Sequence, residues 1–387
     1  MTFPISLVFS FAFIFFFSSI DNSIAPMAKD IASHFSVKPE TGLLLISACS
    51  WSVAAGLLAG PSIISAISPS KTLFFSGIIL SLSSAVFPIS NFFPAALVLR
   101  VLAGFGGGLA ACVMWWMAYH GVEKKYSGSM LAVLMSARPL AVALGVPASA
   151  LAAFYFHWSY PIFLLSAGVF ISAAGVYFSF PEGDGILPEK RIWKGYSKAL
   201  STPYASAFYL GFFLNRMCYF GFYAFCGIWF SHHYGFDLKT TGYYLLIIGL
   251  AEAAVNFFSA SLVEKFGYMK IFYWGILSSA FSLPLFLFGK ADAKTALVLI
   301  SFFMLADRIY VMALASRIPK MFSSNPDKTS FGSLNTLSAW AAGGLIAAVF
   351  SGLIEKKGIF YAETLILVCF LSGSYLLFYC LKKTQSE

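Results

Sequence analysis

Long, unbroken apolar stretches follow one another along the chain, and they limit its fold more than any other feature. A membrane-spanning helix needs about 20 mainly apolar residues, whereas a strand of a transmembrane β-barrel alternates between apolar and polar residues. The stretches here are continuous, as in LVFSFAFIFFFSSI at 7–20. They lie near 4–27, 42–68, 72–90, 93–120, 127–155, 158–180, 205–231, 240–262, 271–289, 295–319, 330–354 and 358–381. We therefore expect an all-α integral membrane protein with twelve transmembrane helices.

The composition supports this class, because 59% of the 387 residues are hydrophobic and 11% are charged, against roughly 25% charged in a soluble domain. No Lys or Arg precedes the first stretch and Asp21 interrupts it, so we expect it to remain as a helix and not to be removed as a signal peptide. The six cysteines lack metal-ligand spacing, and no cofactor or metal is expected. Basic residues are sparse, which argues against a nucleic-acid partner.

The most charged connection, 181–203, divides the stretches into six and six. We expect an N-terminal bundle at 1–180, a linker at 181–203 and a C-terminal bundle at 204–387. A weak internal echo supports two similar halves, since GSMLAVLMSARPLAVALG at 128–145 resembles GSLNTLSAWAAGGLIAAV at 332–349. Loops on the side of both termini hold about twice as many Lys and Arg as the opposite loops, which predicts cytoplasmic termini and a cytoplasmic linker.

Charged residues within the apolar stretches are the best candidates for function, because each costs at least about 2.5–3.5 kcal/mol at a helix centre unless it is paired or hydrated. These residues are Asp21, Arg100, Arg138, Arg216, Glu252, Asp307 and Arg308. Counting 1.5 Å per residue places Asp21 and Arg100 in the same outer third, where they can meet. The other five fall near the midplane and predict a polar chamber between the halves. The alternative is that these charges only pair with one another and so hold neighbouring helices together.

The predicted chamber also suggests a ligand. Its three arginines oppose two carboxylates, and an excess of one positive charge predicts a substrate with an acidic or electron-rich group. The candidate substrate-binding residues are Arg138, Arg216, Arg308, Tyr219, Tyr223 and Trp116. Two alternatives remain open. Arg138 can cap carbonyls freed by Pro139, or chloride or water can neutralise the excess, and the aromatic residues can serve ordinary helix packing.

Three motifs resemble the major facilitator superfamily, and within it the twelve-helix drug and sugar efflux permeases. They are RVLAGFGGGLAA at 100–111, LGVPASALAAFYFHWSYPIF at 144–163 and IDNSIAP at 20–26. The resemblance implies two six-helix bundles that alternate access to one site, with proton coupling through Arg100 and Asp21. We add Glu252 and Asp307 to the candidates for proton coupling, because they lie at the midplane.

Residues that resemble the family's conformational motifs are Gly60, Pro61, Gly104, Gly108, Gly145, Pro147, Glu264, Lys265, Gly267 and Lys270. The loop after the second stretch departs from the pattern, because GPSIISAISPSK keeps only Lys71 of its charges, whereas LVEKFGYMK at 262–270 keeps the charged order. The charge-relay latch of the family is therefore expected in the second half alone.

Together these features predict a secondary transporter of the cytoplasmic (inner) membrane, a monomer surrounded by lipid, that exports a small organic molecule in exchange for protons. The alternative is uptake or exchange of a small organic anion. An integral membrane enzyme is less favoured, because no HxxxD, DxD or HExxH cluster occurs in a suitable context, and a channel or receptor does not explain the two-half repeat.

Overall fold

The computed structural model describes residues 2–118, 130, 133, 136–179, 197, 200–321 and 328–383. In the first half the helices are α1 (Thr2–Ser23), α2 (Ala28–His34), α3 (Pro39–Ile67), α4 (Pro69–Val86), the short η1 (Phe87–Ile89), α5 (Phe93–Trp116), the π-helical turn η3 (Ala141–Gly145), α7 (Val146–Tyr155) and α8 (Ser159–Ser179). In the second half they are α10 (Ala205–Tyr234), α11 (Leu238–Phe266), α12 (Tyr268–Phe288), α13 (Ala293–Met321), α14 (Lys328–Lys357) and α15 (Ile359–Lys383).

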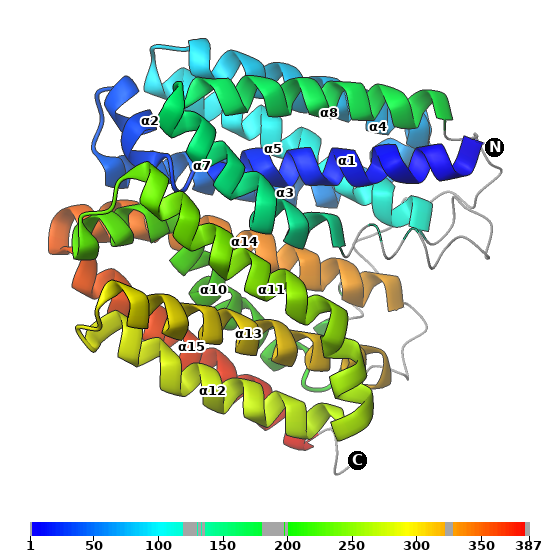
Figure 1. Cartoon of the computed structure of the whole chain (residues 1–387). Coiled ribbons are helices and arrows are strands. Elements are labelled where there is room, and N and C mark those ends of the chain that lie inside the picture. The colour runs from blue at the N-terminus through cyan, green and yellow to red at the C-terminus, as the bar shows by residue number, and fades with distance from the viewer. Residues whose placement is uncertain are drawn as a thin grey trace.

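All twelve expected stretches fall on helical segments, and the all-α membrane fold is confirmed. In the described part of the chain, eleven helices are long and apolar enough to span a membrane, and η3 and α7 belong to one of them, Ser136–Tyr155. The remaining long helix, α10, has 30 residues and carries Asn215 and Arg216 in its middle. It passes through the same bundle as the others (Figure 1).

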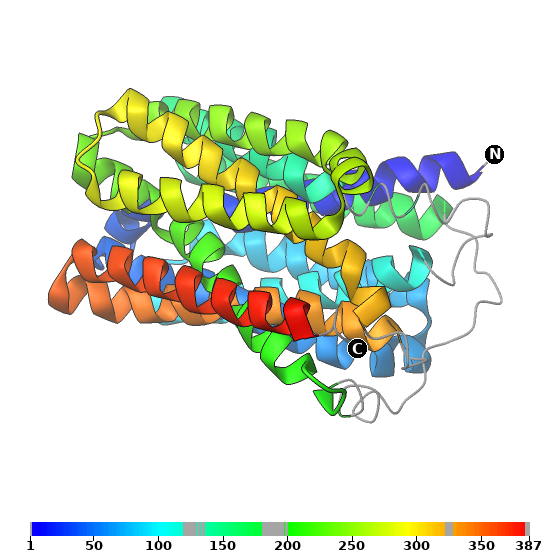
Figure 2. The same cartoon turned by 90° about the horizontal axis from the view of Figure 1, so that it is seen from below.

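The helices form two halves that lie side by side (Figure 1), and in Figure 2 the second half faces the viewer. Within the first half α1 packs on α8 and α3 on α5, and within the second α10 packs on α15 and α12 on α13. The halves meet where α3 packs on α14 and where α7 packs on α11. The predicted bundle limits at 180 and 204 remain predictions, because most of the 181–203 linker lies outside the described residues.

Both chain termini lie at the same end of the bundle, which we call the terminal end (Figure 1). The opposite end, which carries α2 and the turns at Gly235 and Gly358, is the distal end. These names refer to the fold alone, and cytoplasmic termini remain a prediction.

Glycines bring α3 and α5 into backbone contact, because the absence of side chains lets the two helices approach closely. A side chain at Gly104 would collide with the Cys49 carbonyl, and one at Gly108 would collide with the Val53 carbonyl. A side chain at Gly60 would meet the Cys112 side chain at 2.6 Å. Pro61 follows within the same helix α3. The motif glycines of the first half therefore set the distance between two neighbouring helices.

We expect Gly108→Ala to destabilise the protein by about 1–3 kcal/mol, the usual range for overpacking, because the new methyl group meets backbone atoms that cannot turn aside. Gly352→Ala is the matched control, since nothing lies within 4 Å of the corresponding position on α14. Thermal unfolding of both variants in detergent measures the difference. Equal stability of the two would contradict the close packing of α3 on α5.

A regular α-helix is interrupted at η3, which the sequence analysis did not predict. Pro147 has no N–H to donate, and its ring would clash with the carbonyl four residues earlier, so a wider turn before it relieves the conflict. Gly145 at the end of this turn lies against Ser19 of α1, where no side chain fits. The segment that carries Arg138 therefore enters the bundle through a turn whose geometry follows from Pro147.

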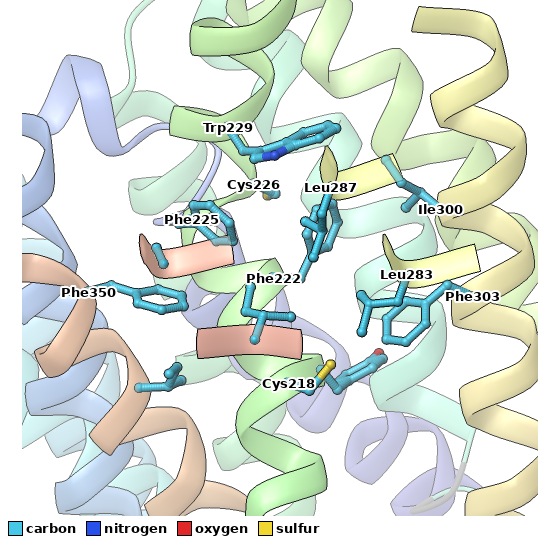
Figure 3. Close-up of a cluster of buried hydrophobic side chains, with 14 of the residues drawn as sticks. Cys218, Phe222, Phe225, Cys226, Trp229, Leu283, Leu287, Ile300, Phe303 and Phe350 are labelled. Carbon is cyan, nitrogen blue, oxygen red and sulfur yellow. The ribbon is translucent and has the colours of Figure 1, made fainter. Parts of the chain in front are cut away.

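The aromatic residues of α10 mostly build the core of the second half. Phe222, Phe225 and Trp229 recur on one helical face and are fully buried. Figure 3 shows them among Leu283 of α12 and Phe350 of α14. This packing holds α10 in place and fixes the positions of the polar residues one and two turns earlier on the same helix.

Candidate functional site

A cavity lies between the halves near the middle of the bundle. Its empty volume, counting all space between the protein atoms and including space open to solvent, is about 450 Å³. The lining residues are Asp21, Asn22, Ala25, Ile46, Ser50 and Arg138 from the first half, and Phe220, Tyr223, Ala224, Ala339, Trp340 and Gly343 from the second. Both halves therefore contribute polar and aromatic side chains to one site.

Asp21 and Arg100 meet, as their predicted depth allows. Both side chains are buried, and Arg100 Nη2 donates to Asp21 Oδ1 at 3.1 Å. Arg100 Nε also donates to the Leu45 carbonyl at 3.3 Å. The pair thus links α1, α5 and α3, with the Asp21 carboxylate at the wall of the cavity and the guanidinium behind it.

Arg138 is the cation of the cavity, and its charge has no direct partner. Its guanidinium lies 4.4 Å from the Trp340 ring centroid and 5.5 Å from that of Phe220, close enough for cation–π attraction. Among the described residues, none makes a hydrogen bond or an ion pair with Arg138. The arginine of the first half is therefore held by aromatic residues of the second half.

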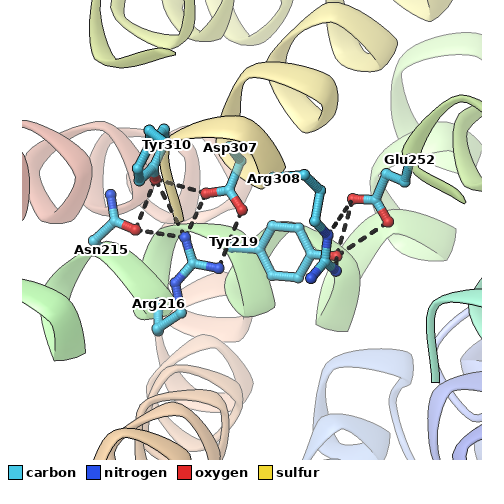
Figure 4. Close-up of polar contacts among 7 residues, drawn as sticks. All are labelled: Asn215, Arg216, Tyr219, Glu252, Asp307, Arg308 and Tyr310. Atoms are coloured by element: carbon cyan, nitrogen blue, oxygen red, sulfur yellow. Dashed lines mark hydrogen bonds and ion pairs between the residues drawn. The ribbon is translucent and has the colours of Figure 1, made fainter. Parts of the chain in front are cut away.

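Arg216 belongs to a buried network behind the cavity (Figure 4). Its Nη2 donates to Asp307 Oδ1 at 2.5 Å and its Nη1 donates to Asp307 Oδ2 at 3.1 Å, a two-pronged contact between α10 and α13. The Tyr310 hydroxyl donates to Asp307 Oδ1 at 2.6 Å, and Asn215 Oδ1 accepts from Arg216 Nη2 at 2.6 Å. The carboxylate therefore has strong, charge-assisted partners.

Arg308, next in sequence to Asp307, points to a different helix. Its Nε lies 3.6 Å from Glu252 Oε1 on α11, and its guanidinium also contacts the Tyr219 hydroxyl. That hydroxyl donates to Glu252 Oε1 at 2.9 Å, while the Tyr219 ring lies between Arg308 and Arg216 (Figure 4). Neighbouring residues on a helix point about 100° apart, so Asp307 and Arg308 serve two separate pairs.

The pairs show where the predicted excess charge resides. Asp21 neutralises Arg100, Asp307 neutralises Arg216 and Glu252 neutralises Arg308. Four arginines against three carboxylates leave one positive charge, and the remaining arginine is Arg138. The excess therefore lies on the wall of the cavity and not within the network of the second half.

The candidate residues separate into two groups. Of those expected to bind substrate, Arg138 and Tyr223 line the cavity, whereas Arg216, Arg308 and Tyr219 lie in the network and Trp116 packs in the first-half core. Of the proton-coupling candidates, Asp21 lines the cavity, and Glu252 and Asp307 do not. The sequence analysis expected all five midplane charges in one chamber, and the structure instead buries four of them as pairs inside the second half.

Trp340 is a cavity residue that the sequence analysis missed. The internal repeat held a signal for it, because the segment 332–349 echoes 128–145 and places Trp340 opposite Ser136, two residues before Arg138. Repeat-related segments meet at the interface of such halves. Phe220 belongs to the aromatic group of Tyr219 and Tyr223, which the sequence offers as a possible pocket lining with helix packing as the alternative, and the structure places it at the cavity.

The latch residues of the second half lie at the terminal end. Glu264, Lys265 and Lys270 are exposed, and within the described part of the chain Glu264 has no ion-pair partner. Gly267 has φ = +82°, a conformation that favours glycine, and it forms the turn from α11 to α12. The glycine of this motif is thus explained by the backbone, and the latch role of the charges stays a prediction.

A family profile described as Major Facilitator Superfamily matches residues 9–348. The chain belongs to the major facilitator superfamily. It is therefore a secondary transporter that moves small molecules by alternating access, and the family consists of transporters and not of enzymes.

A solved structure shows the same fold. The transporter is similar to the inward-open conformation of the xylose transporter XylE from E. coli, with 13% sequence identity, a TM-score of 0.74, and coverage of 98% of this chain and 96% of that chain. A search of curated proteins gave no significant match. At this identity the likeness concerns the fold alone.

In this transporter, contacts at the distal end tie the halves together. Lys38, just before α3, donates to Glu355 Oε1 of α14 at 2.8 Å, which raises the pKa of the Lys38 ammonium group. Lys239 of α11 lies over the rings of Phe154 and Tyr155 of α7, at 5.7 and 5.4 Å. Both contacts cross the two surfaces at which the halves pack, so they hold the halves together at the distal end.

We expect Glu355→Lys to shift the transporter towards the state that is open at the distal end, since it replaces attraction to Lys38 by repulsion. The pair is exposed and screened by solvent, so the change in population should be no more than roughly fivefold. Spin-label distances between Ser33 and Lys356 report the opening. The double exchange Lys38→Glu, Glu355→Lys restores the attraction and serves as control. A shift that persists in the double variant would show that the pair is not the cause.

Proposed function

We propose that this transporter carries a small organic molecule with an acidic group, and that proton movement through Asp21 drives its export. One observation supports the choice of substrate above all others. The excess positive charge of the membrane interior lies on Arg138, in the cavity that both halves line. A charge in that position is costly without a counter-ion, and a substrate anion would supply one.

The surroundings of Arg138 suit an acidic group. Trp340 and Phe220 lie over the guanidinium, whose N–H groups point outward in the plane of the fork. A carboxylate or phosphate binds to such a fork with two parallel hydrogen bonds, which a lysine cannot offer. Capping of carbonyls near Pro139 is less favoured, because no carbonyl among the described residues accepts a hydrogen bond from Arg138. Chloride or water in the cavity remains the competing explanation.

Asp21 suits proton coupling because it lies between Arg100 and the cavity. A nearby cation favours the carboxylate and removal from water favours the neutral acid, so exposure of the cavity to one side or the other changes its protonation. Protonation would release Arg100 from its main partner. The export direction rests on the likeness of the Gly145–Pro147 segment to efflux permeases, and uptake or exchange is the alternative.

Transport by the purified protein in liposomes tests the proposal. We expect uptake of radiolabelled organic monoanions into inverted vesicles to follow an imposed pH gradient, and neutral or cationic analogues of the same size to be carried at least tenfold more slowly. The same vesicles without a gradient measure exchange. Gradient-driven movement of cations in preference to anions would overturn the substrate assignment, and movement in the opposite direction would select uptake.

A further inference from the structure

The contact between Arg138 and Trp340 joins the two halves of the transporter. Arg138 belongs to the first half, whereas Trp340 lies on α14 and Phe220 lies on α10, both in the second half. The centroids of the two rings lie 4.4 and 5.5 Å from the guanidinium carbon. Alternating access moves the halves relative to each other, so an attraction that joins them resists this movement.

Trp340 reaches deep into the first half. It is buried in an apolar cluster whose other buried members, within the described part of the chain, all belong to the first half. Its ring stacks on that of Phe17 of α1, with 6.3 Å between the centroids and 22° between the planes. The indole therefore contacts an apolar side chain and a cation of the opposite half at the same time.

Close packing of the helices fixes the position of the indole. Its helix α14 packs on α3 of the first half. A side chain at Gly344, one turn beyond Trp340, would lie 2.8 Å from the Trp51 ring of α3. Because the backbone of α14 is held this close to the first half, the indole stays beside the Arg138 guanidinium while the halves are together.

The strength of the contact depends on the charge of Arg138. The face of an aromatic ring is partly negative, so it attracts a cation, and the attraction is strongest where water is excluded. An acid bound in the plane of the guanidinium would neutralise this charge and weaken the attraction to the ring, while the apolar contact of the indole persists. The ring faces and the edge of the guanidinium are separate surfaces, so an acid and the indole can contact Arg138 together.

We propose that the contact between Arg138 and Trp340 ties the halves together in the empty transporter, and that a bound acid loosens the tie. The loaded transporter then changes state faster than the empty one, and return of the empty transporter is the slow step of net transport. This inference rests on the proposed function. It makes Trp340 a positioning residue that acts through Arg138, and Phe220, at the greater distance, contributes less.

Single-molecule fluorescence energy transfer tests the inference on the full-length protein in lipid nanodiscs. Dyes at Lys71 of α4 and Lys270 of α12, both exposed, report how fast the two halves move relative to each other. The probe is methanesulfonate, a monoanion that stays charged, and methanesulfonamide is its neutral counterpart. We expect methanesulfonate to speed the switching of the wild type roughly five- to thirtyfold, the range for loss of a desolvated cation–π contact, and the sulfonamide to leave it unchanged.

Changes at position 340 separate charge from packing. Trp340→Leu removes the ring, so the empty variant should switch as fast as the loaded wild type and should no longer respond to methanesulfonate. A tetrafluorinated tryptophan keeps the shape of the indole but removes most of the negative charge from its face, and it should act in the same direction. Trp340→Phe should keep part of the response. Trp274→Leu is the matched control, because Trp274 is 69% exposed on α12.

The outcomes separate this inference from the proposed function. If neither Trp340→Leu nor the fluorinated residue speeds the empty transporter, the tie is overturned, whatever ligand binds. If Trp340→Leu speeds it and the fluorinated residue does not, packing in the first-half cluster holds the halves and the role of charge is overturned. The fluorinated residue decides if Trp340→Leu does not fold. Tighter binding of methanesulfonamide than of methanesulfonate in equilibrium dialysis would overturn the proposed function instead.

Discussion

Asp21→Asn is expected to abolish transport driven by a pH gradient while substrate exchange without a gradient continues. The asparagine keeps the size of the side chain at the cavity wall but cannot bind or release a proton, so Arg100 faces the same neutral partner in every state. Coupling then fails although the cavity is intact. The measurement is uptake and counterflow of one labelled substrate in the same liposome preparation, at pH 6 and pH 8.

Asp292→Asn is the control for the loss of a carboxylate, because Asp292 is exposed at the distal end and its hydrogen bonds to Thr295 and to the Lys294 amide lower its pKa. It should leave gradient-driven transport unchanged. If transport by Asp21→Asn remained fully coupled to the pH gradient, the role of Asp21 would be contradicted. Glu252 would then be the next candidate for the proton site. Loss of exchange together with coupling would indicate damage to the substrate site instead.

Asp307→Asn is expected to destabilise the transporter by about 3–5 kcal/mol, the usual cost of removing one partner of a buried ion pair. Asparagine retains one oxygen acceptor, so the Arg216 guanidinium would lose one of its two contacts and its counter-charge, and it would remain charged inside the second half. The double variant Arg216→Met, Asp307→Leu removes both charges, and it should recover most of the loss because replacing a buried pair by apolar residues is often neutral.

Thermal unfolding in detergent measures both effects, with Glu264→Gln as a control at an exposed carboxylate without an ion-pair partner among the described residues. If Asp307→Asn left stability unchanged, the buried Arg216–Asp307 pair would not stabilise the packing of α10 on α13. If Arg216→Gln instead kept stability and lost substrate binding, the assignment of Arg216 to the substrate site would be favoured over that of Arg138.

The sequence predicts the helices and the depth of each charge because both follow from position along an apolar stretch. A helix rises 1.5 Å per residue, and this sufficed to place Asp21 beside Arg100 and the remaining charges near the midplane. Whether a charge faces the cavity or a neighbouring helix depends on how each helix is turned about its axis. Arg216 and Arg138 lie at similar depth, and only the packing of their helices separates the paired one from the unpaired one.

Contacts between segments that are far apart in the sequence could not be predicted either, and the reason is a different one. Lys38 and Glu355 are 317 residues apart, and both are exposed charges of a common kind near the ends of helices. The π-helical turn at η3 follows from Pro147, but its effect on the direction of Arg138 depends on the surrounding helices. The internal repeat indicates the segment that carries Trp340, but it does not show which side chain of that segment lines the cavity.

Binding of matched ligands to the wild type, Arg138→Gln and Arg138→Lys tests the central claim most directly. The probes are 3-phenylpropionate, 3-phenylpropanol and 3-phenylpropylamine, compared by equilibrium dialysis. The claim predicts that the wild type binds the anion most tightly. Arg138→Gln should lower the affinity for the anion roughly ten- to a hundredfold, which is the usual effect of losing hydrogen bonds to a charged group. Arg138→Lys should recover only part of this affinity. Tightest binding of the amine, unchanged in Arg138→Gln, would contradict the claim.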